Sequence, residues 1–195
     1  MAYTFTQIQS AVRANVNDIT ASVTQDIDDA VNMLSNFFSL KKINTSIPTV
    51  ASQNYIAKPS NTIEIERIEI DTTPYNETNL AKISVNENDE SKRFYDYNGA
   101  IQILPTPTSA VATKIWYRSG FTPLAGSEST DVPDRLVPLL IILATWFYFL
   151  RIVSKVGTER QSYPDMTPKE AGDIATEWKK QFDSMLTSIK TQKNV

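Results

Sequence analysis

Carboxylates are the side chains of this sequence with the clearest capacity for chemistry. They are concentrated between residues 61 and 92, where acidic residues outnumber basic ones. The acidic residues are Glu64, Glu66, Glu69, Asp71, Glu77, Glu87, Asp89 and Glu90, and the basic ones are Arg67, Lys82 and Lys92. Two carboxylates about 5–10 Å apart in a pocket can hydrolyse a glycosidic bond. An exposed acidic strand face explains the same residues without any pocket, and it is the preferred interpretation.

Other catalytic and metal-binding chemistry has little support. Histidine and cysteine are both absent, which removes the commonest general base, the commonest metal ligand and all thiol chemistry. The five glycines are scattered and form no phosphate-binding loop. Asp26, Asp28 and Asp29 are close in sequence, but a solvated helix start explains them better than a metal site. We therefore predict a protein that is not an enzyme and has no cofactor and no metal.

The segment that must organise the chain is residues 132–153, an apolar run that fills every face of a helix. Asp131 and Pro133 suit its start, while Pro138 predicts a kink or a separate short turn. A helix that is apolar all round is either enclosed by protein or in lipid. The run is short for a bilayer and ends at Arg151, so we expect a central core helix with Trp146 and Phe149 buried.

Amphipathic helices are predicted on both sides of the middle of the chain. Thr4 with Gln7, and Ser22 with Gln25, match capping boxes before helices over about residues 5–18 and 23–40. The sequence Thr167-Pro168-Lys169-Glu170 provides an N-cap, a proline at the first helical position and a glutamate two residues later. An apolar stripe then continues to Ile189, and the last residues, TQKNV, should fray.

Between these helices the apolar period changes from 3.6 to 2. Isoleucines alternate with charges from Ile63 to Ile70, and their phase slips at Glu66–Arg67, which predicts a β-bulge. Residues 80–85 suggest a weaker strand. Asn98-Gly99 between two apolar runs predicts a type I′ hairpin over 94–104. A last strand is expected over 111–118.

Together these elements predict an α+β fold in a single domain spanning residues 1–195. Helices within 5–40 and 132–190 are expected to form an antiparallel helix bundle, because their apolar faces need one another. Residues 46–120 are expected to form a small inserted antiparallel β lobe.

Composition narrows the class of protein further. The chain has 195 residues, of which 41% are hydrophobic and 21% charged, as in ordinary globular proteins. Its net charge of −3 is of the wrong sign for a general nucleic-acid binder. The N-terminal sequence MAYTFTQIQ has no basic or apolar signal region, so we expect no secretory signal.

The order of short motifs resembles a known family. Ala100-Ile-Gln-Ile-Leu-Pro-Thr-Pro, then Lys114-Ile-Trp-Tyr, then Asp131-Val-Pro-Asp precede the apolar helix and a capped amphipathic helix. This order is similar to that of head-to-tail adaptor proteins of tailed bacteriophages, also called head-completion or connector proteins. The long acidic segment around residues 71–92 and the bulky central helix depart from the family pattern.

The resemblance implies a structural virion protein at the head–tail junction, made in the host bacterial cytoplasm. Such proteins bind beneath the portal protein in a ring, usually of twelve copies, and join tail or further connector proteins. DNA passes through the channel without sequence-specific binding, and no membrane is involved. Candidate contacts with other copies or the portal are Phe94, Tyr95, Tyr97, Trp116, Tyr117, Ile189 and Lys190. The alternative is another tail-proximal ring protein, such as a tail terminator or a tube-associated protein.

Overall fold

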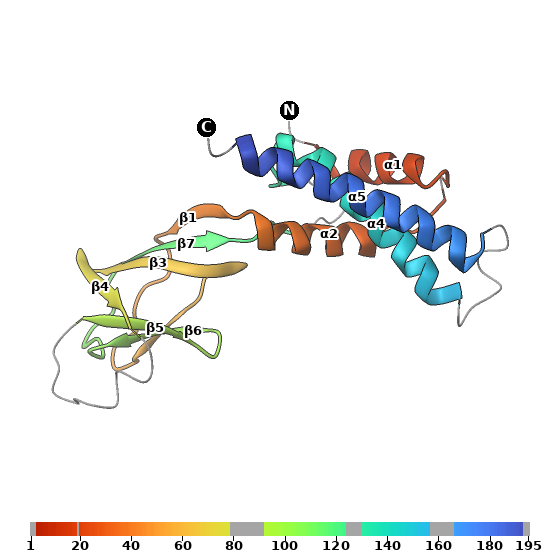
Figure 1. The fold of residues 1–195 in the computed structure, drawn as a ribbon. Helices are drawn as coiled ribbons and strands as arrows, with labels where there is room; N and C mark the ends of the chain where they lie inside the picture. The colour runs from red at the N-terminus through yellow and green to blue at the C-terminus, as the bar shows by residue number, and fades with distance from the viewer. Residues whose placement is uncertain (1–2, 19, 79–91, 124–129, 157–165, 193–195) are drawn as a thin grey trace. The chain divides into compact units, whose positions relative to one another are not determined.

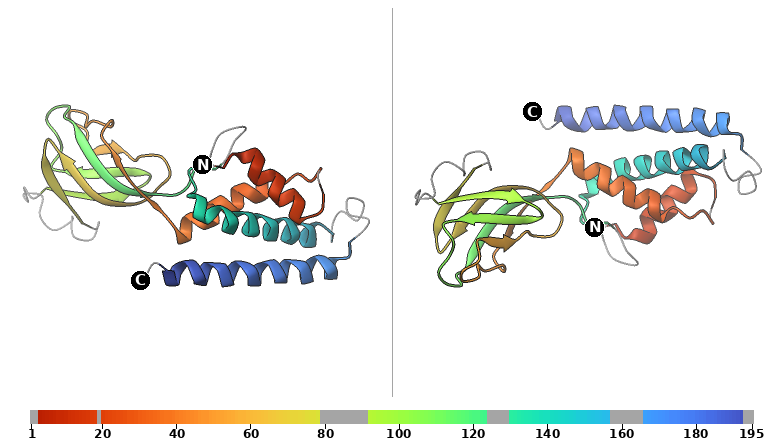
Figure 2. Two further views of the ribbon diagram at one scale, coloured as in Figure 1. Left: turned by 90° about the horizontal axis from the view of Figure 1, so that it is seen from above. Right: turned by 90° about the horizontal axis from the view of Figure 1, so that it is seen from below.

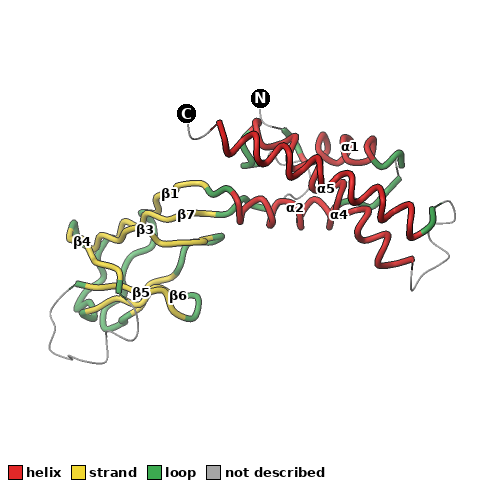
Figure 3. Tube along the Cα trace, in the orientation of Figure 1, coloured by secondary structure: helices red, strands yellow, loops and turns green. Residues whose placement is uncertain are grey.

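The chain folds into two compact units. The computed structural model describes residues 3–18, 20–78, 92–123, 130–156 and 166–192. The first and last parts of the chain, residues 1–37 and 121–195, make a helical unit, and Phe38–Gly120 makes a β unit. Figure 3 shows this division, with helices at the two ends of the chain and strands between them.

The helical unit consists of helices packed around α4. Its elements are α1 (Phe5–Asn15), α2 (Thr24–Phe37), the short 3-10 helix η1 (Asp134–Leu136), α4 (Val137–Val156) and α5 (Pro168–Gln192). Helices α1, α2 and α5 each contact α4 (Figure 1). The buried faces follow helical spacing, as Ile27, Val31 and Leu34 do on α2. The apolar run 132–153 is therefore central to its unit, as predicted.

Two of the predicted helix starts are confirmed by their hydrogen bonds. At α1, the Gln7 amide donates to Thr4 Oγ1 and the Thr4 amide donates to Gln7 Oε1, which is a complete capping box. At α5, the Thr167 amide and hydroxyl both donate to Glu170 Oε2, at 2.8 and 2.7 Å. These bonds hold the pKa of Glu170 below its usual value.

The other starts differ from expectation. Helix α2 begins at Thr24, and the side chain of Gln25 donates to Asp29 Oδ1. Asp131 does not cap the central helix, because its carboxylate accepts hydrogen bonds from the amide and hydroxyl of Thr122. The separate short turn predicted from Pro138 is present as η1, and Pro138 lies in the first turn of α4, where its missing N–H breaks no helical hydrogen bond.

The packing of α4 is less complete than its composition suggested. Phe149 is buried, as predicted, but Trp146 is only half-buried and Leu150 is exposed. Among the described helices, Asp134–Ser154 is the one long and apolar enough to cross a membrane by length and composition, and 56% of its most apolar stretch is buried within the protein. A core helix meets the same criteria, and the packing against three helices favours that interpretation.

The β unit is a seven-stranded mixed sheet that curls into a half-barrel (Figure 2). The strands are β1 (Leu40–Asn44), β2 (Tyr55–Ala57), β3 (Thr62–Ile70), β4 (Thr73–Glu77), β5 (Arg93–Tyr97), β6 (Ala100–Leu104) and β7 (Thr113–Ser119). They are ordered β1-β7-β3-β4-β5-β6-β2, and β4 and β5 are parallel. The inner face encloses a core that includes Ile68, Phe94, Ile101 and Ile115.

Local predictions within the sheet are confirmed. The register of β3 against β7 shifts between Ile65 and Arg67, at the predicted slip, and again next to Ile63. Tyr97 pairs with Ala100, which leaves Asn98 and Gly99 as a two-residue loop with φ of 50° and 76°. Positive φ at both positions is the requirement of a type I′ turn. The predicted strand at residues 80–85 lies outside the described residues.

The predicted fold class is wrong. In place of a helix bundle with a small antiparallel β lobe, the structure has a seven-stranded mixed sheet with its own core and helices at the chain ends. Strands β1, β2 and β4 were not predicted as strands. Residues 38–40 were assigned to the preceding helix, but α2 ends at Phe37 and Leu40 begins β1. These short strands have little apolar alternation of their own. The partners of β1 and β2, which are β7 and β6, are also distant in the chain.

Candidate interaction surfaces

The carboxylates of β3 lie on the outer face of the sheet and face basic residues of neighbouring strands. Glu64 Oε2 lies 3.5 Å from Arg118 Nη1 of β7, and Glu66 Oε1 lies 3.5 Å from Arg118 Nε and from Lys41 Nζ of β1. Cross-strand pairs of opposite charge stabilise a sheet modestly and are screened by salt. The carboxylates of β3 therefore form a paired, solvated strand face, as preferred from the sequence.

One depression beside these strands contains two carboxylates. Glu69 and Asp71 line it with Lys114 and the three threonines Thr45, Thr72 and Thr113, around a volume of about 330 Å³. Glu69 is also in an ion pair with Arg67, and Asp71 is exposed. A glutamate paired with an arginine and an aspartate open to solvent fit a solvated strand face, which stays the preferred interpretation of this depression.

Trp116 lies in the middle of the same outer face. It pairs with Ile43 of β1 on one side and with Arg67 of β3 on the other. The Arg67 guanidinium carbon and Lys114 Nζ lie 5.0 and 4.8 Å from the centroid of its ring. Contacts of this kind stabilise by about 0.5–1 kcal/mol at exposed sites. We call Ile43, Trp116 and Arg67 the Trp116 row. Trp116 is half-buried and Ile43 is exposed, so this row presents apolar surface among charged side chains.

Three tyrosines share the outer face at the other end of the sheet, and we call this set the tyrosine face: Tyr55, Tyr95 and Tyr97. Gln102 of β6 pairs with Tyr55 of β2 on one side and with Tyr95 of β5 on the other. The rings of Tyr95 and Tyr97 are 6.4 Å apart, and Tyr55 and Tyr97 are exposed. Tyrosine suits protein interfaces because it combines an apolar ring with a polar tip.

Two of the residues predicted as contacts lie in the core of the β unit. Phe94 and Tyr117 are both buried among the isoleucines of the inner face. Side chains alternate between the faces of a strand, so Tyr95 and Trp116 point outward because Phe94 and Tyr117 point inward. Tyr55 was not among the contacts predicted from the sequence. It lies in a strand of only three residues, beside the buried Ile56, and so short a strand has too little alternation to be recognised in the sequence.

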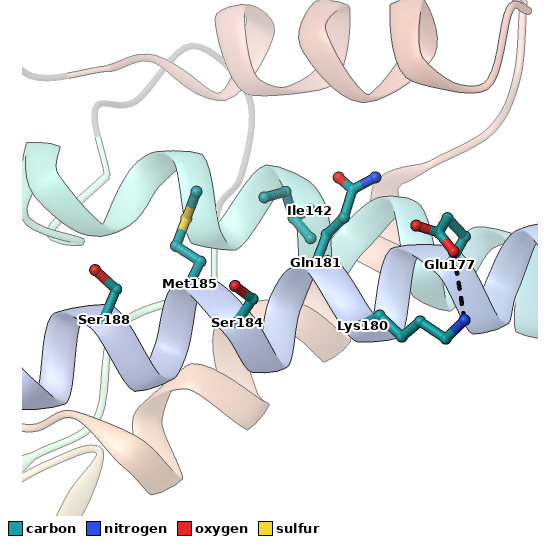
Figure 4. A pocket seen from close by; sticks show the side chains of 7 residues that line it. All are labelled: Ile142, Glu177, Lys180, Gln181, Ser184, Met185 and Ser188. Carbon is teal, nitrogen blue, oxygen red and sulfur yellow. Dashed lines mark ion pairs between the residues drawn. The ribbon is translucent and has the colours of Figure 1, made fainter.

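On the helical unit, a groove of about 560 Å³ runs between α4 and α5. Figure 4 shows its lining, with Ile142 of α4 facing side chains of α5. The α5 residues are Glu177, Lys180, Gln181, Ser184, Met185 and Ser188, and Glu177 and Lys180 form an ion pair at its rim. The groove lies where α5 covers the surface of α4 incompletely.

The predicted contacts Ile189 and Lys190 lie in the last turns of α5. Ile189 is half-buried and Lys190 is exposed, with its Nζ 5.1 Å from the centroid of the Phe37 ring. Thr191 and Gln192, the first two of the five residues expected to fray, are still helical, and residues 193–195 lie outside the described residues. Ile189 and Lys190 therefore belong to the regular part of α5.

The acidic trio of α2 differs from the solvated helix start that was predicted. Asp26 is buried and accepts two hydrogen bonds from Arg151 of α4, from Nε at 2.9 Å and from Nη2 at 2.7 Å. The same Nη2 donates to the carbonyl of Ser22. Within the described residues, no group of three or more acidic side chains is placed to hold a metal ion.

A comparison with family profiles decides what kind of protein has these surfaces. The SU10 adaptor protein profile matches residues 3–195, which is nearly the entire chain. The chain belongs to the SU10 adaptor protein family. This is a family of phage head-to-tail adaptors, so the resemblance seen in the motif order is confirmed. A comparison of this adaptor with curated proteins finds no match.

Membership gives the general role of the adaptor. It is a structural component of a phage virion that associates with portal or tail components. The family is structural rather than catalytic. The candidate surfaces for contacts of the adaptor with other proteins, among the described residues, are the tyrosine face, the Trp116 row and the end of α5.

Proposed function

We propose that this adaptor forms a closed ring of twelve copies beneath the portal protein of a tailed phage and links it to tail or further connector proteins. The observation that supports this most strongly is the adaptor family match over residues 3–195. In this proposal the protein is made in the host bacterial cytoplasm and takes its place at the head–tail junction. The genome passes through the channel of the ring.

A ring of identical subunits needs two different surfaces on each copy, because every contact in it is heterologous. We assign the tyrosine face and the Trp116 row to these contacts, since both present aromatic side chains outside the core. Replacing Tyr55 and Tyr97 together by alanine should weaken ring formation and leave the fold intact. Tyr3→Ala, at an exposed tyrosine of the helical unit, is the matched control and should form rings normally.

We assign portal docking to the segment after Leu186. Deleting Ser188–Val195 should weaken docking while the helical core stays folded, because Phe182 and Leu186, the last two buried residues among the described side chains of α5, precede the cut. A truncated protein that decorates portal rings as well as the full chain would exclude this segment as the docking element.

Passage of DNA is compatible with the charge of the protein. Each lysine or arginine contact to phosphate adds affinity that would retard a sliding duplex. The net charge is −3, and Lys41, Arg67 and Arg118 of the β unit lie in ion pairs with glutamates. A channel lined by this protein would therefore hold DNA weakly.

The decisive experiment combines native mass measurement with negative-stain imaging of the purified protein, alone and with portal rings. We expect a monomer or weak association alone and a closed ring on the portal. A full-length protein that never binds a portal would overturn the proposal. Binding to the tail tube in place of the portal would indicate a tail terminator.

A further inference from the structure

The end of α5 is fastened to the end of α2 within the helical unit. Phe37 is the last residue of α2, and its ring packs against Phe182 of α5 with centroids 6.0 Å apart and planes tilted by 56°. Two turns further along α5, Lys190 Nζ lies 5.1 Å from the centroid of the same ring. We call these three residues, Phe37, Phe182 and Lys190, the clasp.

The two sides of the clasp differ in strength. Phe182 is buried and also stacks on Trp146 of α4, at 6.4 Å, so its position is fixed by the core. Phe37 is 37% exposed and Lys190 is exposed. A cation over an exposed aromatic ring shifts an equilibrium by a factor of about two to five. The Lys190 side of the clasp is therefore the one that can open without unfolding the unit.

We propose that the clasp is an autoinhibitory contact that keeps the last turns of α5 from the portal in the free protein. The inference rests on the proposed function, in which the segment after Leu186 docks on the portal. In this proposal the portal takes the ammonium group of Lys190 away from the ring of Phe37, so the contact with the ring competes with docking. Docking must then overcome the contact between Lys190 and Phe37, while the packing of Phe37 on Phe182 stays in place.

The test replaces the ring without removing the apolar contact. Phe37→Leu keeps a side chain that packs on Phe182 but removes the π face that holds Lys190. Phe37→Tyr is the matched control, because it keeps that face. Lys179→Gln, at another exposed lysine of α5 that pairs with Asp183, removes a surface contact of the helix outside the clasp and so controls for specificity.

Two measurements are needed on full-length protein: amide hydrogen exchange over residues 186–191, and affinity for purified portal rings. For Phe37→Leu we expect exchange about two- to five-fold faster and binding tighter by a similar factor. Phe37→Tyr should match the wild type in both, and Lys179→Gln should leave exchange over residues 186–191 unchanged.

Each other result counts against the proposal. Unchanged exchange in Phe37→Leu would show that the clasp does not hold the end of α5. Faster exchange with unchanged or weaker binding would show a clasp that does not inhibit docking. If neither the wild type nor the variants bind a portal, the proposed function fails and the proposed autoinhibition fails with it. The exchange data still decide whether the clasp holds the end of α5.

Discussion

At the scale of single residues, Arg151 of α4 and Asp26 of α2 form a part-buried ion pair within the helical unit. Both carboxylate oxygens of Asp26 are held by the guanidinium, which also lies 5.2 Å from the ring centroid of Tyr148. A buried carboxylate is tolerated only when it is paired and hydrogen-bonded. This pair joins the first turn of α2 to α4, and it fixes which residues of the two helices meet.

Removing one member of this pair should destabilise the protein strongly. Arg151→Met leaves Asp26 buried without its cation, and we expect a loss of about 3 kcal/mol in the free energy of unfolding. Urea denaturation is the measurement. Adding Asp26→Leu to the same protein should recover most of the loss, because the uncompensated charge is then gone. A single variant as stable as the wild type would show that the pair contributes nothing.

In the turn between β3 and β4, Thr72 has a positive φ, which is unusual for a β-branched residue. Ile70 pairs with Thr73, so Asp71 and Thr72 form a two-residue loop with φ of 48° and 64°. A β-branched residue is strained at positive φ, whereas glycine is not.

Thr72→Gly should therefore raise the free energy of unfolding, by about 1 kcal/mol. The neighbouring change Thr73→Gly, within β4, should lower it instead, because glycine weakens a strand. Chemical denaturation of both variants checks the pair of predictions. Destabilisation by Thr72→Gly would mean that the threonine side chain is needed in this turn.

At the scale of elements, α4 packs unevenly around its circumference. Phe149 is buried and Trp146 is half-buried with its ring stacked on Phe182. Phe149→Ala should thus cost about 3–5 kcal/mol, as large truncations in cores do, and Trp146→Ala should cost less. Thermal or urea denaturation of the two variants gives the comparison. Equal costs would indicate that α5 covers Trp146 more fully than the structure shows.

The first turn of α5 should make a small contribution to stability that depends on pH. Hydrogen bonds from Thr167 lower the pKa of Glu170 in the folded protein. A lowered folded-state pKa stabilises above the ordinary glutamate range, and this stability is lost as pH falls through the folded pKa.

Glu170→Gln should accordingly flatten the acid side of the stability profile, measured by denaturation between about pH 3 and pH 6. Asp173→Asn, at a nearby exposed carboxylate of α5, is the control and should keep the pH dependence of stability that Glu170 contributes. An unchanged profile in Glu170→Gln would show that the capping box does not contribute.

At the scale of the whole molecule, the β unit has the properties of a separate folding module. Its core is its own, and its two ends are adjacent, because Leu40 at the start of β1 pairs with Ser119 at the end of β7. A domain inserted through two neighbouring strands can fold without its host.

Residues 38–120 expressed alone should consequently unfold in one cooperative transition, with a red shift in the fluorescence of Trp116, the single tryptophan in that segment. The isolated module is also the reagent for asking which unit makes the ring contacts. A segment without a cooperative transition would show that the helical unit is needed for its folding.

The candidate surfaces were only partly visible in the sequence. Tyr95, Tyr97 and Trp116 were identified by their aromatic character, and the alternation of the strands leaves them outside the core. The same criterion selected Phe94 and Tyr117, because residue type alone does not say which face of a sheet is covered. Which of these side chains contact another protein stays a prediction.

What the sequence determined by itself is local. Thr4 with Gln7 and Thr167 with Glu170 set helix starts because each side chain bonds the backbone three residues away, and Asn98-Gly99 sets a turn because both residues accept positive φ. Tertiary structure alone decided the parallel pairing of β4 with β5, the burial of Asp26 and the half-exposed Trp146. These depend on partners distant in the chain, and the free energy of burying a side chain depends on what covers it, which no local pattern records.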